Sequence, residues 1–142
     1  MRYFFITVLL AVSAALHAQD RTLRVDYMFT GTAKSSEICL DEMSCFDGWA
    51  GRRHNMDSVA LRGNGQISLK DIETGKVLYR QSFSTLFQEW QATEEATRVR
   101  KSFENVFLLP MPKDVADVTV ELTDNHGKVS SRFTHRVFPK DS

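Results

Sequence analysis

The chain has 142 residues, of which 42% are hydrophobic, 11% aromatic and 25% charged, and its 18 Lys and Arg residues balance its 18 Asp and Glu residues. These proportions are ordinary for one globular domain and exclude a disordered chain, which would combine few apolar residues with a large net charge. The zero formal charge also argues against a nucleic-acid partner, because there is no surplus of cations to displace counterions from a phosphate backbone.

Residues 1–18 have the pattern of a secretory signal peptide. Arg2 supplies the positive charge, an apolar stretch covers residues 3–16, and small residues lead to Ala18. Cleavage is expected after Ala18, with Ala15 as a second site. A membrane-anchoring helix is the other interpretation, but the stretch is short for a bilayer span. We therefore expect a secreted or periplasmic protein whose mature part, residues 19–142, is one domain without a membrane span.

Alternating apolar and polar residues predict β-strands along most of the mature chain. The clearest strand runs from Leu23 to Phe29, and a shorter one is expected around residues 37–40. Residues 45–64 mix glycines, aromatic residues and cations without periodicity, so a long ordered loop is predicted there.

Cys39 and Cys45 are the only two cysteines of the chain. In an oxidising compartment they can form a local disulfide, provided that a turn brings their Cα atoms within about 7 Å. Two separate thiols are the alternative. A zinc site is not expected, since it needs about four ligands and the only nearby histidine is His54.

Two β-hairpins are predicted from pairs of strand patterns joined by glycine-containing turns. The strands of the first are residues 66–71 and 76–83, and those of the second are residues 118–122 and 133–137.

The segment between the hairpins is predicted to contain the only helical structure. One helical turn is expected at residues 84–90, and Thr93 is expected to cap a short helix that continues to about Arg100. Residues 103–109 return to a strand, which ends at Pro110 because proline lacks the amide hydrogen of the ladder. The whole pattern predicts an all-β fold: a two-sheet antiparallel β-sandwich, immunoglobulin-like, with about seven strands and one short helix.

The sequence contains no catalytic or metal-binding motif. A His-Glu-x-x-His pair is absent, and His54, His126 and His135 are isolated from one another. A Gly-x-Ser-x-Gly elbow, a phosphate-binding glycine loop and a calcium loop are absent as well. Neighbouring carboxylates occur at residues 41–42 and 94–95, but adjacent side chains diverge on strands and helices. We therefore expect no catalytic residue, no metal and no cofactor.

Trp49, Arg52, Arg53 and His54 form the cluster whose residue types best suit ligand binding. An aromatic platform beside cations can stack on a sugar ring or hold a carboxylate. The alternative, which we favour, is that Trp49 packs on the edge of the sandwich and the arginines pair with acidic neighbours. Trp90 has the same two interpretations, as a ligand platform or as a core residue, and the core role is the more common.

Four blocks of residues follow one another in an order and spacing typical of one protein family. They are Gly-Trp-Ala-Gly-Arg-Arg at 48–53, Gly-Asn-Gly-Gln-Ile at 63–67, Ser-Phe-Ser-Thr-Leu-Phe-Gln-Glu-Trp at 82–90 and Phe-Glu-Asn-Val-Phe-Leu-Leu-Pro at 103–110. Together they resemble the N-terminal domain of the secreted bacterial IgA peptidases, a family of zinc metallopeptidases, from about Leu23 to Val137.

The resemblance implies a β-sandwich that precedes a separate catalytic domain carrying the zinc-binding histidines. Residues 1–142 contain no counterpart of those histidines, so no catalytic residue is transferred to this chain. The expected function is that of a secreted, non-catalytic accessory domain that binds or targets through a protein or glycan surface. The expected partners are a peptidase catalytic domain, a host or surface protein, or a glycan.

Two other functions remain open from the sequence. The first is a truncated or split zinc metallopeptidase whose catalytic part is encoded separately. The second is a free-standing adhesion or sugar-binding module that shares this domain.

Overall fold

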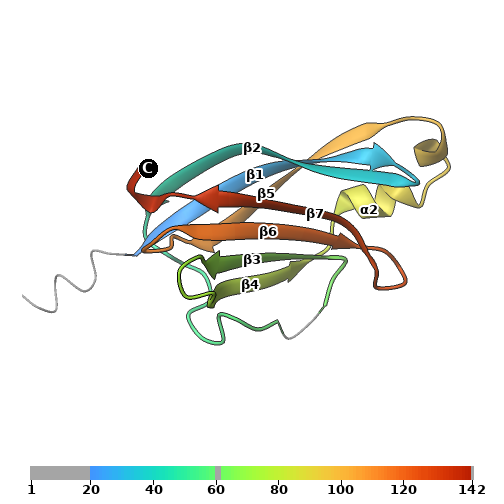
Figure 1. Cartoon of the computed structure of the whole chain (residues 1–142). Coiled ribbons are helices and arrows are strands. Elements are labelled where there is room, and N and C mark those ends of the chain that lie inside the picture. Colours follow the sequence, from blue (N-terminus) through green and yellow to red (C-terminus); the bar gives the residue numbers. More distant parts are fainter. Residues whose placement is uncertain (1–19, 60–61, 142) are drawn as a thin grey trace, which may run out of the picture.

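The computed structural model describes residues 20–59 and 62–141. The signal peptide expected at residues 1–18 lies outside the described residues. Within them, seven strands form two antiparallel sheets that pack face to face (Figure 1). The predicted two-sheet β-sandwich is confirmed.

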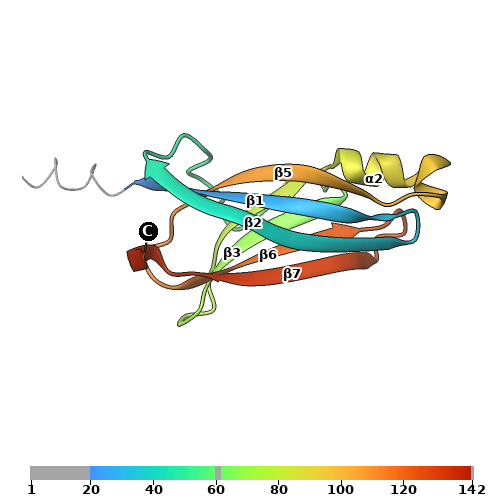
Figure 2. The ribbon, with the colours of Figure 1, turned by 90° about the horizontal axis from the view of Figure 1, so that it is seen from above.

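The three-stranded sheet has the order β2-β1-β5 and the four-stranded sheet the order β4-β3-β6-β7. Figure 2 looks down on the three-stranded sheet, with the other sheet below it. The first strand of an immunoglobulin sheet lies at its edge, whereas β1 is central here. The strands are β1 (Arg21–Thr32), β2 (Ser35–Asp47), β3 (Gly65–Asp71), β4 (Val77–Phe83), β5 (Lys101–Pro110), β6 (Ala116–Thr123) and β7 (Val129–Val137).

The core lies between the inner faces of the two sheets. Val25, Tyr27 and Phe29 of β1 are fully buried, as the alternation along this strand predicted. The facing side chains come from β3 and β6, which alternate in the same way. Those buried side chains are Ile67, Leu69, Val118, Val120 and Leu122.

β2 is longer than its sequence indicated, because it continues through residues 45–47, which were predicted to belong to a loop. A bulge opposite Asp26 and Tyr27 shifts the register of β2 against β1, so the period of two is interrupted. Residues 41–44 are all exposed, which also hides the alternation. The edge position of β2 and its bulge therefore explain the error.

The same strand explains why the local disulfide does not form. Cys39 and Cys45 are both free thiols on β2. At about 3.3 Å per residue their Cα atoms are roughly 20 Å apart, far beyond the reach of a disulfide. Cys45 pairs with the buried Leu23 and faces inward, whereas Cys39 pairs with Met28 on the outer face.

The helical segment differs from the prediction in its capping residue. Helix α2 (Leu86–Gln91) is capped by Thr85, whose hydroxyl accepts a hydrogen bond from the Gln88 amide at 3.1 Å. The prediction that Thr93 caps a following helix is wrong, because its hydroxyl donates to the Trp90 carbonyl at 2.7 Å instead. Beyond it there is a short 3-10 turn, η1 (Glu95–Thr97). No helix among the described residues is long and apolar enough to cross a membrane.

A buried polar contact joins the two sheets. The Tyr27 hydroxyl lies 2.5 Å from Nε2 of His135, and the two ring centroids are 5.6 Å apart. Burial raises the pKa of Tyr27. Burial also lowers the pKa of His135, an effect that the charge of Asp117 partly opposes. His135 is therefore neutral in the folded protein near pH 7.

We predict that the free energy of unfolding falls as the pH drops below about 6.5. The unfolded chain protonates His135 near its ordinary pKa, whereas the folded chain does so only at a lower pH, so the unfolded state binds more protons in that range. Urea unfolding between about pH 7.5 and 5 measures the effect. His135→Gln should flatten the slope and the exposed His126→Gln should retain it; equal slopes in both variants would contradict the prediction.

Candidate functional site

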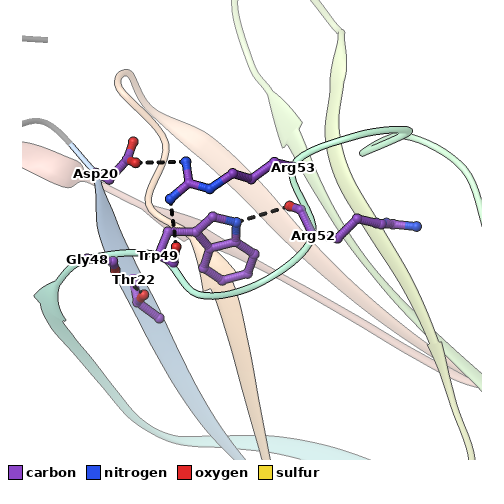
Figure 3. Close-up of polar contacts among 6 residues, drawn as sticks. All are labelled: Asp20, Thr22, Gly48, Trp49, Arg52 and Arg53. Carbon is purple, nitrogen blue, oxygen red and sulfur yellow. Dashed lines mark hydrogen bonds and ion pairs between the residues drawn. The ribbon is translucent and has the colours of Figure 1, made fainter. Parts of the chain in front are cut away.

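The segment that leaves β2 is folded by contacts of its own backbone, many of them drawn in Figure 3. Gly48 has a positive φ of 90°, donates its amide to the Asp20 carbonyl at 2.9 Å and accepts the Thr22 hydroxyl at its own carbonyl. The indole Nε1 of Trp49 donates to the Arg52 carbonyl at 3.0 Å. The half-buried indole also meets Tyr79 edge-on, with 5.6 Å between ring centroids. The Gly48–Trp49 block is thus a tight connection between β2 and the following loop.

Arg52 fastens this loop to the edge of β4. Its guanidinium donates to the carbonyls of Ser58 at 2.7 Å, Met56 at 3.2 Å and Arg80, and it lies 5.1 Å from the centre of the Tyr79 ring. The Arg80 amide in turn donates to the Met56 carbonyl at 2.7 Å. Arg52 therefore binds backbone carbonyls of its own chain, whereas the structural alternative expected it to pair with acidic neighbours.

Arg53 does pair with an acidic neighbour. Its guanidinium bridges the Asp20 carboxylate and the Trp49 carbonyl, both at 2.8 Å (Figure 3). His54 follows on the exposed surface of the loop. The structure brings Trp49, Arg52 and Arg53 together as a loop anchor, and ligand binding by them and by His54 stays a prediction.

Trp90 lies at the other end of the sandwich, on α2, and does not join the Trp49 cluster (Figure 1). Its ring stacks on Phe87, with 6.1 Å between centroids, and tilts against Phe103 at 5.7 Å. Its Nε1 donates to the Glu95 carboxylate at 2.8 Å, and Lys101 Nζ lies 5.9 Å from the ring centre. Trp90 thus packs against the core and fixes the turn that follows α2.

Three adjoining hollows lie at the end of the sandwich where β1 begins and β7 ends. Figure 1 shows this end of the sandwich at the left, beside the C-terminus. The first, of 300 Å³, lies between β2 and β7 and contains Met43, Met111 and Phe138. The second, of 390 Å³, shares Phe138 with the first and adds Ile72. The third, of 420 Å³, shares Met111 with the first and adds Met56.

We call Met43, Ile72, Met111 and Phe138 the terminal surface. Met43, Ile72 and Phe138 are 40%, 39% and 52% exposed, which is high for large apolar side chains that lie together. Charged residues of both signs border these hollows: Glu73, Lys113, Asp114 and Lys140. An apolar centre with a charged rim is typical of protein interfaces, and flexible methionines adapt well to a partner.

The terminal surface is exposed because the core is open at this end. Met43 pairs with the buried Val25, so it points toward the interior between the sheets. β2 continues to Asp47, whereas the opposing edge strand β7 ends at Val137. The inward side of β2 is therefore incompletely covered.

Sequence reasoning missed this surface because its residues lie far apart and outside the regular patterns. Met43 follows the bulge of β2, Ile72 lies in a turn, Met111 lies between two prolines, and Phe138 follows the last strand. The Trp49 cluster, which the sequence did single out, supports this surface indirectly. Arg52 holds the carbonyl of Met56, and Met56 borders the terminal surface. Arg52 thus positions one wall of the site.

The described part of the chain holds no group of three or more His, Cys, Asp or Glu side chains placed to share a metal ion. In comparisons with known proteins, the family described as peptidase M64 N-terminus matches residues 16–134, which is most of the chain. No curated protein matches the chain significantly.

We predict that Arg52→Lys lowers the free energy of unfolding by about 1–3 kcal/mol, because a lysine cannot serve the carbonyls of Met56, Ser58 and Arg80 together. Arg53→Lys is the matched control. Its ion pair with Asp20 is exposed, so the change should be below about 1 kcal/mol. Denaturant unfolding compares the variants, and an equal loss in both would refute the role given to Arg52.

Proposed function

The chain belongs to the peptidase M64 N-terminal domain family, and on that basis we propose that it is a secreted or periplasmic accessory domain that binds a protein through its terminal surface and performs no catalysis itself. The signal-peptide pattern of residues 1–18 supports the location. Membership in the N-terminal part of a peptidase family supports a non-catalytic role, because activity resides in a particular site rather than in a fold.

The terminal surface is the observation that carries the proposal. Three large apolar side chains are exposed together over adjoining hollows, which charged residues of both signs border. Each of these side chains is already about half-buried, so covering its exposed part in an interface is worth roughly 1 kcal/mol. A partner that covers several of them gains the sum of these contributions, which favours binding at this surface.

A protein is a better partner for this domain than a glycan. The indole of Trp49 is held edge-on by Tyr79 and hydrogen-bonded to the Arg52 carbonyl. Trp90 packs against Phe87 and Phe103. Both tryptophans thus have partners within the fold, whereas Phe138 projects from the terminal surface.

We predict that Phe138→Glu weakens binding of the protein partner at least tenfold, which corresponds to about 1.4 kcal/mol. Leu86→Glu is the matched control, because Leu86 is also apolar and 72% exposed but lies at the α2 end. The mature chain and both variants would be immobilised and offered the secreted proteins of the producing cells. We expect mass spectrometry to identify a protein that is captured by the wild type and by Leu86→Glu but not by Phe138→Glu.

Retention of the same proteins by Phe138→Glu would overturn the assignment of the terminal surface. Catalysis is tested separately by incubating the purified mature chain with zinc and an unfolded protein substrate. We expect no cleavage; cleavage that copurifies with the chain through several columns would contradict a non-catalytic role.

A further inference from the structure

We propose that the protein bound by the terminal surface is an M64 peptidase catalytic domain, and that an apolar segment of this domain enters the opening between β2 and β7. The segment would cover Met43 and Cys45, which face inward on β2. This inference rests on the proposed function and adds to it the identity of the partner and its point of entry.

The position of the opening within the chain favours this partner. The matched family model describes the N-terminus of a peptidase, and the resemblance to the IgA peptidases implies a catalytic domain on the C-terminal side of this domain. Val137, the last residue of β7, and Phe138 both line the opening, and the 3-10 turn η2 (Pro139–Asp141) follows directly. Elements that follow one another in a chain are usually neighbours in space. A catalytic domain that follows η2 would thus begin beside the terminal surface.

The opening is an uncovered part of the core. Met43 and Cys45 pair with Val25 and Leu23, both of which are buried. Leu23 and Met111 line the same 300 Å³ space. An apolar side chain that entered would extend the existing core, so its contacts would resemble interior packing and exclude water.

The charges at the opening indicate what accompanies that apolar segment. Arg21 donates from Nη2 to Cys45 Sγ at 2.8 Å and lies 3.7 Å from the carboxylate of Asp47. The Asp47 side chain is 97% exposed, so this ion pair is solvated and contributes little. A carboxylate carried by the incoming segment can replace it and form a shielded pair with Arg21. We therefore expect an acidic residue next to the apolar residues of the segment.

The two cysteines provide a direct test, because they lie on one strand but on opposite faces. The mature chain would be alkylated with iodoacetamide, alone and with a saturating amount of a purified M64 peptidase catalytic domain. Labelling of Cys45 and Cys39 would be followed by peptide mass spectrometry. We expect the catalytic domain to slow the labelling of Cys45 at least tenfold and to leave that of Cys39, the internal control, unchanged.

Binding would be measured in parallel by calorimetry. Binding without protection of Cys45 overturns the point of entry, while the proposed function stands. Absence of binding, with Phe138-dependent capture of another protein, overturns the identity of the partner alone. Loss of both kinds of binding overturns the proposed function as well.

A second pair of variants tests the opening without cysteine chemistry. Met43→Glu places a charge in the opening, and Val106→Glu places one on the outer face of the edge strand β5, where Val106 is 48% exposed. Met43→Glu should weaken binding of the catalytic domain at least tenfold and Val106→Glu should not, with the fold of both checked by circular dichroism. Equal affinities of the two variants would contradict the inference.

Discussion

The inner face of β1 is the constraint on which the rest of the fold depends. β1 is hydrogen-bonded on both sides, to β2 and β5, and its alternate side chains are apolar. Those side chains require a second sheet over them, and β3 and β6 provide its centre. When two sheets face each other, the apolar core between them is still open at the edges and at the two ends of the sandwich. This domain covers most of those openings with different elements.

The open sides of the sandwich are closed in different ways, and one end is left open. At the α2 end, Phe87 packs against Phe29 while the Ser131 hydroxyl donates to the Ser36 carbonyl at 2.8 Å, which joins the edge strands β7 and β2. Along β4 the closure is the loop that Arg52 holds. At the opposite end β2 outruns β7, and the core stays open. The terminal surface is thus a product of unequal strand lengths at one edge.

The sequence predicted most of the strands, both hairpins and the sandwich, because alternation and glycine turns are local signals. It did not predict the second half of β2, since a bulge interrupts the period of two. The helix cap could have been found: Thr85 and Gln88 have the Thr-x-x-Gln spacing of a capping box, and this is the pair that the structure uses. Residue type singled out the Trp49 cluster but could not decide between a structural and a ligand-binding role, because an arginine that holds backbone carbonyls has the same sequence signature as one that holds a ligand. The same loop requires a glycine at position 51, since a Cβ there would lie 2.2 Å from the Trp49 indole.

The loop that crosses β4 has a consequence for the behaviour of the protein in concentrated solution. The free edge of a β-sheet offers unpaired amides and carbonyls, and another chain can add to it as a strand. On β4 the Arg80 amide is taken by the Met56 carbonyl, and the Arg80 carbonyl is taken by Arg52. A strand approaching this edge would find the middle of the ladder occupied. The Gly-Trp-Ala-Gly-Arg-Arg block therefore also hinders edge-to-edge pairing between chains, a role of its residues that needs no ligand.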